Sequence, residues 1–286
     1  MGVYGMSHLY QNVPMTHGIT IDDAMVETFH NEGVVVLRGV LSIDEIQSLR
    51  QGIDAVLADP SPRAKVASQS DDPGFFLEDF CTWRDHRVFD TFIRNTALVP
   101  IAARLMQSRT VRLYHDHVLV KEAGTRQRTP WHQDQPYYDV EGFQNVSFWI
   151  PVDPVPIESS LESVAGTHRG PWLMPRTFRD QQAKWFPEGS LSELPDIEAD
   201  RSAHGIRAWD LELGDVIAFH MLTVHGAAGS AHRRRVFSLR LLGDDMVHAP
   251  RHWVCSPDFR AVIPEDDDQR RAGESLDGEW FPLLLG

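Results

Sequence analysis

The stretch TPWHQDQ at residues 129–135 places a histidine and an aspartate two positions apart. Side chains at positions i and i+2 of a β-strand lie on the same face, so His132 and Asp134 are able to bind one metal ion together. Such a pair is common by chance, and a single histidine more often has a structural role. The pair therefore gains weight only from a third ligand elsewhere in the chain.

A third candidate ligand follows a predicted turn and strand. Gly214 and Asp215 favour a turn, the apolar run at residues 216–221 favours a strand, and His225 comes shortly after it. Two imidazoles and one carboxylate form the facial triad of mononuclear iron oxygenases, which leaves positions for a bidentate 2-oxo acid and for dioxygen. A ligand set without thiolate fits Fe(II) better than a structural zinc. We therefore predict that His132, Asp134 and His225 are the metal ligands and the catalytic centre.

An arginine-rich stretch, RRRVFSLR at residues 233–240, follows the last of these ligands. On a strand, Arg234 and Arg240 share one face with the residues at 236 and 238, whereas Arg235, Phe237 and Leu239 lie on the other face. A buried guanidinium binds a carboxylate through two parallel hydrogen bonds, so it suits the distal carboxylate of 2-oxoglutarate. A run of arginines alone is more often a solvated basic surface, so this prediction depends on the order of the three motifs.

Composition limits the partners and the location. The chain has 27 basic and 41 acidic residues, a net charge of −14, which makes nucleic acid an unfavourable partner. It has only two cysteines, too few for a disulfide framework, so a cytoplasmic location is expected. The N-terminal residues do not resemble a signal peptide, and no run of eighteen apolar residues is present, so no membrane association is expected. A small-molecule substrate fits these limits, and the sequence leaves the oligomeric state open.

The first third of the chain is predicted to be rich in helix. Helices are expected at residues 21–32, at 43–58 and at 87–108, the last with a break at Pro100. Ser42 and Glu45 form a capping box at the start of the second helix. A short buried strand is expected at Val34–Leu37, and residues 63–82 are expected to be irregular.

Short β-like runs dominate after Arg109, at residues 111–121, 148–152, 216–221 and 236–242. The long segment 170–208 between them has the length of a lid or binding loop, to which Trp172, Trp185 and Phe186 are suited. We predict an irregular N-terminus at 1–18 and a single domain at 19–286, because no linker supports two domains. That domain would have a helical layer at about 19–108, a mainly β barrel core at about 109–245 and a lid-like insertion at about 170–208.

Over roughly residues 20–245 the sequence resembles the phytanoyl-CoA dioxygenase family of Fe(II)/2-oxoglutarate-dependent oxygenases. The resemblance is carried by several motifs that stand in the family's order. These are Thr129–Asp134 (TPWHQD), Leu161–Arg169 (LESVAGTHR), Gly214–His220 (GDVIAFH), His225-Gly226 and Arg234–Arg240 (RRVFSLR).

The resemblance implies a double-stranded β-helix, the cupin-like jelly roll, with helices packed on one side. It also implies iron ligation by the triad and a 2-oxoglutarate anchor at Arg234. Further co-substrate contacts are implied for Trp149, Gln133 and Leu113. Relatives often carry a serine where this chain has Ala227, and the spacing from the distal histidine to Arg234 is two residues shorter than usual, which leaves Arg240 as an alternative anchor.

The implied activity is hydroxylation of an aliphatic C–H bond in a small or medium-sized metabolite. Fe(II) is the implied cofactor, 2-oxoglutarate and dioxygen are the implied co-substrates, and succinate and CO2 are released. Asp134 argues against a halogenase, because halogenase relatives have a small residue at that position. Desaturation, epimerisation and ring closure remain alternative outcomes. Two other classes also remain: a non-catalytic jelly-roll protein that binds a ligand, and a zinc hydrolase, for which no paired general base is visible.

Overall fold

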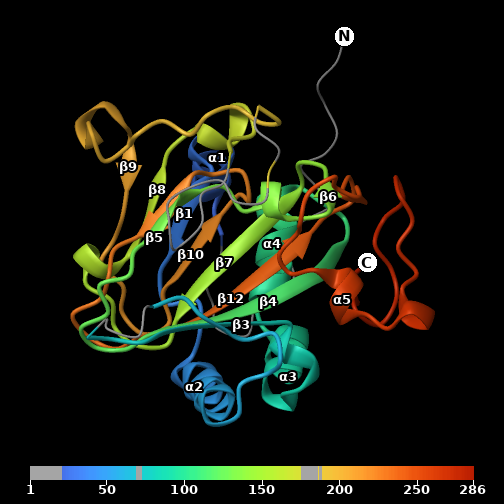
Figure 1. Cartoon of the computed structure of the whole chain (residues 1–286), viewed down its shortest axis with the longest axis horizontal. Helices are drawn as coiled ribbons and strands as arrows, with labels where there is room; N and C mark the ends of the chain where they lie inside the picture. The colour runs from blue at the N-terminus through green and yellow to red at the C-terminus, as the bar shows by residue number, and fades with distance from the viewer. Residues whose placement is uncertain (1–20, 69–72, 175–185, 187–188) are drawn as a thin grey trace.

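The computed structural model describes residues 21–68, 73–174, 186 and 189–286. The irregular N-terminus expected at residues 1–18 lies outside these ranges. Two antiparallel sheets form the body of the molecule, with helices against the larger sheet (Figure 1). This is the mainly β architecture with a helical layer that the sequence predicted.

The larger sheet has eight strands in the order β1-β10-β7-β12-β4-β3-β2, with β14 beside β4. Its strands are β1 (Val34–Leu37), β2 (Lys65–Val66), β3 (Phe76–Phe80), β4 (Val111–Lys121), β7 (Asn145–Pro151), β10 (Val216–Phe219), β12 (Arg234–Leu242) and β14 (Leu283–Leu285). The smaller sheet has four strands in the order β5-β11-β8-β9. They are β5 (Thr129–His132), β11 (His225–Ala227), β8 (Leu161–Val164) and β9 (Ile206–Arg207). A separate pair joins β6 (Val140–Glu141) to β13 (Val247–His248).

The helices are α1 (Asp23–Glu32), α2 (Ile43–Ala58), α3 (Arg87–Asn95), α4 (Leu98–Met106) and the short α5 (Phe259–Val262). The predicted capping box of Ser42 and Glu45 is confirmed at the start of α2. The expected break at Pro100 was wrong: the chain leaves the helix at Thr96 and re-enters it at Leu98. Pro100 lies in the first turn of α4, where the missing N–H would have no helical partner.

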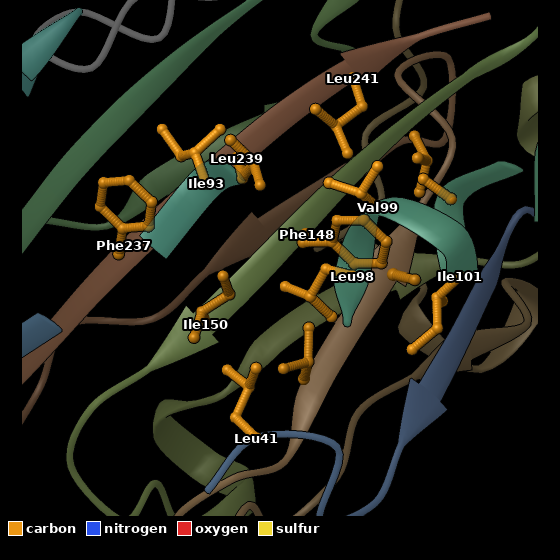
Figure 2. Packing of buried hydrophobic residues seen from close by; sticks show 14 of the residues in the cluster. Leu41, Ile93, Leu98, Val99, Ile101, Phe148, Ile150, Phe237, Leu239 and Leu241 are labelled. Carbon is orange, nitrogen blue, oxygen red and sulfur yellow. The ribbon is translucent and has the colours of Figure 1, made fainter. Parts of the chain in front are cut away.

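Packing between the helices and the large sheet forms the main hydrophobic core. Phe148 and Ile150 of β7 and Phe237 and Leu239 of β12 point toward helix residues such as Leu98 (Figure 2). The Phe237 ring stacks on that of Phe89, with centroids 4.6 Å apart. Because side chains alternate along a strand, Arg234, Ser238 and Arg240 of β12 project from the opposite face, toward the smaller sheet. The alternation predicted for residues 234–240 is confirmed.

The expectation that residues 63–82 are irregular was wrong, since β2 and β3 lie there. All five residues of β3, FLEDF at 76–80, are buried. The polar Glu78 and Asp79 made this stretch look like a loop, but both faces of the strand are covered, so polar and apolar residues are buried alike. Strand β3 pairs with β4 and extends the inner face of the sheet.

Within the described residues, none of the helices combines the length and the apolar character that crossing a bilayer requires.

Candidate metal centre and co-substrate cavity

Neighbouring strands of the smaller sheet bring the predicted ligands together. His132 ends β5, and its antiparallel partner on β11 is His225. Asp134 follows two residues later, at the start of a 3-10 turn. Its Oδ1 lies 3.4 Å from His132 Nε2 and 3.5 Å from His225 Nε2. The three ligand atoms lie within 4.8 Å of one another, close enough for one ion to contact all three.

Backbone carbonyls orient both imidazoles. His132 Nδ1 lies 2.8 Å from the carbonyl oxygen of Pro130, and His225 Nδ1 lies 2.9 Å from that of Thr223. A carbonyl only accepts, so each Nδ1 carries the proton and each Nε2 presents a lone pair, as in most histidine metal sites. Burial lowers the pKa of His225 to about 3, which keeps this ring neutral and able to bind a cation.

Arg240 of β12 supports the aspartate from the larger sheet. Its Nη2 lies 3.2 Å from Asp134 Oδ2, and its Nε donates to the Tyr138 hydroxyl at 3.0 Å. Burial alone would raise the pKa of Asp134, but the charge of Arg240 is the largest opposing influence, and this pKa lies well below its usual range. The carboxylate is therefore ionised, with Oδ2 bound by Arg240 and Oδ1 directed at the two imidazoles.

Arg234 lies on the same face of β12 as Val236, and its environment differs from that of Arg240. Its guanidinium is buried, donates to the carbonyl oxygen of Ser159 and lies 5.6 Å from the Trp149 ring. Burial lowers its pKa to about 10, and among the described residues no carboxylate pairs with it. On the outer face, by contrast, Arg235 pairs with Asp153. A buried guanidinium without an anionic partner is suited to an anionic ligand.

A cavity of about 470 Å³ lies between the sheets and joins these groups. Its wall includes the three predicted ligands and both inner-face arginines. The other lining residues are Lys65, Val66, Ala67, Phe76, Glu78, Phe80, His117, Leu119, Thr129, Tyr137, Tyr138, Trp149, Leu161, Phe219, Ala227, Val236, Ser238 and Ser256. One cavity therefore contains a metal-ligand set, a basic group that suits a diacid, and space for a second molecule.

The implied co-substrate contact at Leu113 does not fit the structure. On β12, Arg240 pairs with His115 and the next residue, Leu241, pairs with Leu113, so Tyr114 is an extra residue on β4. This β-bulge reverses the face of every residue before it. Leu113 is consequently directed into the helix-side core, whereas His117 lines the cavity.

Gln133 is also placed away from the cavity. Its amide nitrogen donates to the carbonyl oxygen of Leu222 at 2.8 Å, and its oxygen accepts from the backbone N–H of Leu173 at 2.7 Å. The buried amide thus ties the metal motif to the start of the long insertion. The structure assigns it a positioning contact in place of the implied co-substrate contact.

The described part of the insertion at 170–208 approaches the cavity through one aromatic residue. The Phe186 ring lies 5.8 Å from that of Tyr137, a cavity residue, and 5.1 Å from that of Trp253. Trp172 lies against the Arg251 guanidinium at 4.9 Å, and Trp185 is outside the described residues. The lid-like role of this segment stays a prediction.

Glu78 is a cavity residue that the sequence interpretation missed. The apolar neighbours Phe76, Leu77 and Phe80 were the available signal for a buried strand, and a glutamate within a buried strand is a candidate functional residue.

The model of the phytanoyl-CoA dioxygenase (PhyH) family matches residues 29–236. The chain belongs to this family. This phytanoyl-CoA dioxygenase family member is 26% identical over 266 residues to L-proline trans-4-hydroxylase of Streptomyces griseoviridis, covering 86% of this chain and 97% of the relative.

Solved structures agree with the fold. The 2-oxoglutarate-dependent carbocyclase SnoK from nogalamycin biosynthesis superposes with a TM-score of 0.70 at 22% identity, over 92% of this chain and 96% of the other. The epimerase SnoN, solved with Fe3+, 2-oxoglutarate and nogalamycin RO, gives a TM-score of 0.70 at 20% identity, over 91% and 97% of the two chains. The jelly-roll fold with a helical layer is confirmed. As a member of this family, the protein is an Fe(II)/2-oxoglutarate-dependent oxygenase, and its donor set fits both cofactors.

Proposed function

We propose that the protein hydroxylates an aliphatic C–H bond of a small or medium-sized organic metabolite, with Fe(II) held by His132, Asp134 and His225. The bound iron and 2-oxoglutarate together activate dioxygen, and the reaction releases succinate and CO2. The protein supplies the ligands, their orientation and a cavity between the sheets that shields the reaction from bulk water. Because the cavity is lined from Lys65 to Ser256, we also propose that residues 19–286 act as one catalytic domain.

Arg234 is proposed to hold the distal carboxylate of 2-oxoglutarate, and Trp149 to flank it. The support is that Arg234 is buried in the cavity wall without a carboxylate partner among the described residues, while Arg240 already contacts Asp134. Where relatives often have a serine, Ala227 lines the same cavity and offers no hydroxyl.

Hydroxylation is favoured over other outcomes by the relative whose name states it, L-proline trans-4-hydroxylase, which covers most of this chain. Epimerisation and ring closure are the activities named for SnoN and SnoK, which share the fold at lower identity. Asp134 supplies a carboxylate ligand, which argues against halogenation. The small-molecule substrate class is consistent with these relatives, and the cytoplasmic location stays a prediction.

The single observation that carries the proposal is the convergence of three ligand atoms in one cavity with an unmatched buried guanidinium. The test is succinate release from 2-oxoglutarate with Fe(II) and ascorbate, first without substrate and then with a panel of metabolites. We expect slow basal release that a substrate accelerates and that yields a hydroxylated product. Tight zinc binding without any succinate release would contradict the proposal and favour a hydrolase.

A further inference from the structure

Among the described residues, three buried polar atoms of the cavity wall lack a hydrogen-bond partner: Arg240 Nη1, beside the metal motif, and the pair formed by Glu78 Oε1 and His117 Nε2. Glu78 of β3 is 3% exposed and His117 of β4 is 7% exposed, and both line the cavity. Glu78 Oε1 and His117 Nε2 lie 3.9 Å apart, too far to bond to each other, and neither has a partner among the described residues. A buried polar group without a partner is unfavourable, so a ligand that satisfies both Glu78 Oε1 and His117 Nε2 is favoured there.

Strand register places this pair on the side of the sheet away from the proposed co-substrate site. His117 is paired with Phe80 of β3 on one side and with Ser238 of β12 on the other, and Ser238 in turn is paired with Trp149 of β7. Glu78 therefore lies two strands from β12, which carries Arg234. Co-substrate and a second molecule can occupy opposite flanks of one cavity.

Burial raises the pKa of Glu78 to about 7, and the charge of Lys65 opposes this rise. Arg240 is paired with Asp134, and Arg234 is assigned to the diacid. Lys121 donates to the carbonyl oxygens of Gln127 and Ala228. Lys65, opposite Glu78 in the register, lies over the Phe80 ring at 5.2 Å and near Ser256 at 3.4 Å. In the part of the chain that the structure describes, no side chain or backbone group donates a hydrogen bond to Glu78 Oε1.

The neighbouring imidazole accepts a hydrogen bond at Nε2 in the tautomer that carries its proton on Nδ1. Burial and then Arg240 hold the pKa of His117 well below its usual range, so the ring is neutral. The Phe80 ring stacks on it at 4.0 Å and fixes its plane. Two acceptors 3.9 Å apart are both within the usual hydrogen-bond distance, about 2.9 Å, of one nitrogen placed between them. That nitrogen needs two N–H groups and a positive charge to match the carboxylate.

We propose that Glu78 and His117 bind a protonated primary or secondary amine of the substrate, one N–H donating to each. Around this pair the wall is apolar, with Phe76, Leu119 and Tyr137, so the body of the substrate is a compact hydrocarbon skeleton. The substrate class is therefore a small amine or amino acid rather than a neutral lipid or an acyl thioester. This inference rests on the proposed function, because it names the substrate of the same site.

The experiment uses the full chain loaded with Fe(II) and 2-oxoglutarate. The probes are small cyclic and linear amino acids, each compared with its N-acetyl derivative and with the carbon analogue that lacks the nitrogen, for example L-proline against cyclopentanecarboxylate. The readouts are substrate-stimulated succinate release and the concentration for half-maximal stimulation. We expect at least one free amine to stimulate release at a concentration at least 100-fold lower than its N-acetyl and carbon analogues require.

Stimulation by amine-free compounds alone, or equal stimulation by an amine and its carbon analogue, would overturn the proposal. So would a lack of response to every amine in a protein whose basal succinate release shows working iron and 2-oxoglutarate sites. Absence of basal release would instead count against the proposed function, which keeps the two failures distinct.

Variants separate recognition from folding. Glu78→Gln keeps the size of the side chain and removes its charge, so the preference for the amine over its carbon analogue should fall at least 30-fold. Glu78→Asp retains the charge and should recover part of that preference, and His117→Asn should lower it independently. The matched control is Glu27→Gln on the exposed face of α1, which should preserve the preference. An unchanged preference in Glu78→Gln would refute the role of this carboxylate.

Discussion

Arg240 of β12 lies against Asp134, with Nη2 3.2 Å from Oδ2, although Asp134 is in the turn after β5 and the two residues are 106 positions apart. This contact joins the larger sheet to the metal motif that follows β5. It gives the two inner-face arginines of β12 different tasks: Arg240 orients a metal ligand, and Arg234 remains for the co-substrate. The motif spacing left Arg240 open as an alternative anchor. Its position against Asp134 disfavours that role, although its residue type would suit it.

The first prediction contrasts these two arginines. Arg234→Gln should raise the KM for 2-oxoglutarate about 100-fold, because losing one partner of a buried charge pair costs about 2–5 kcal/mol. Arg240→Gln should instead weaken Fe(II) binding about 10- to 100-fold, as is usual for residues that orient metal ligands. Steady-state kinetics and equilibrium iron titrations of both variants measure the split. The reverse ranking of the two KM effects would move the anchor to Arg240.

A second prediction concerns Gln133. Its amide satisfies the N–H of Leu173 and the carbonyl of Leu222, so Gln133→Ala should lower the free energy of unfolding by about 1–3 kcal/mol. Because the side chain does not line the cavity, the KM for 2-oxoglutarate should change by less than about threefold. Urea unfolding and kinetics check both values. A large rise in KM with unchanged stability would restore the co-substrate contact that the family resemblance implied.

The sequence could predict site residues where side chains alternate along a regular strand, and it failed where that alternation is interrupted. The alternation of residues 234–240 follows from a two-residue repeat, which local sequence reveals. The strand expected through His132 and Asp134 was wrong in part, because β5 ends at His132 and Asp134 reaches the site from the start of a 3-10 turn. The contact that the family resemblance implied for Leu113 is absent because the extra residue at Tyr114 turns Leu113 into the core, and nothing in the sequence of β4 announces a bulge. Glu78 was overlooked because a strand covered on both faces does not alternate, and that cover comes from distant segments.

The third prediction tests the helix-side core. Phe237 is fully buried and stacks on Phe89, so Phe237→Ala should lower the free energy of unfolding by about 3–5 kcal/mol through lost contacts and a new cavity. The control is Val254→Ala, since Val254 is 53% exposed and should change stability by less than about 0.5 kcal/mol. Chemical denaturation measures both variants. Equal effects would mean that the helices do not pack on β12 as described.

A fourth prediction concerns acid stability. His220 Nε2 donates to the Phe143 carbonyl and Nδ1 accepts from the Leu222 N–H, so only the neutral ring fits. Burial lowers its pKa from 6.5 to about 3. The unfolded chain therefore binds this proton more readily, and stability falls as pH drops from about 6.5 toward 3, by up to about 1.4 kcal/mol per pH unit for this group.

Unfolding free energies at pH 6.5 and 5.5 test this contribution. Replacing His220 with Asn should reduce the loss between these two pH values by about 1 kcal/mol relative to the unmodified protein. Identical losses in the two proteins would show that His220 does not titrate as its buried contacts require.

The iron site is tested most directly by anaerobic Fe(II) titration in the presence of 2-oxoglutarate, comparing the unmodified protein with Asp134→Ala and with the control Asp44→Ala on the exposed side of α2. We predict one tightly bound iron per chain for the unmodified protein and the control, and loss of that binding together with succinate release for Asp134→Ala. Undiminished iron binding and turnover in Asp134→Ala would contradict ligation by His132, Asp134 and His225.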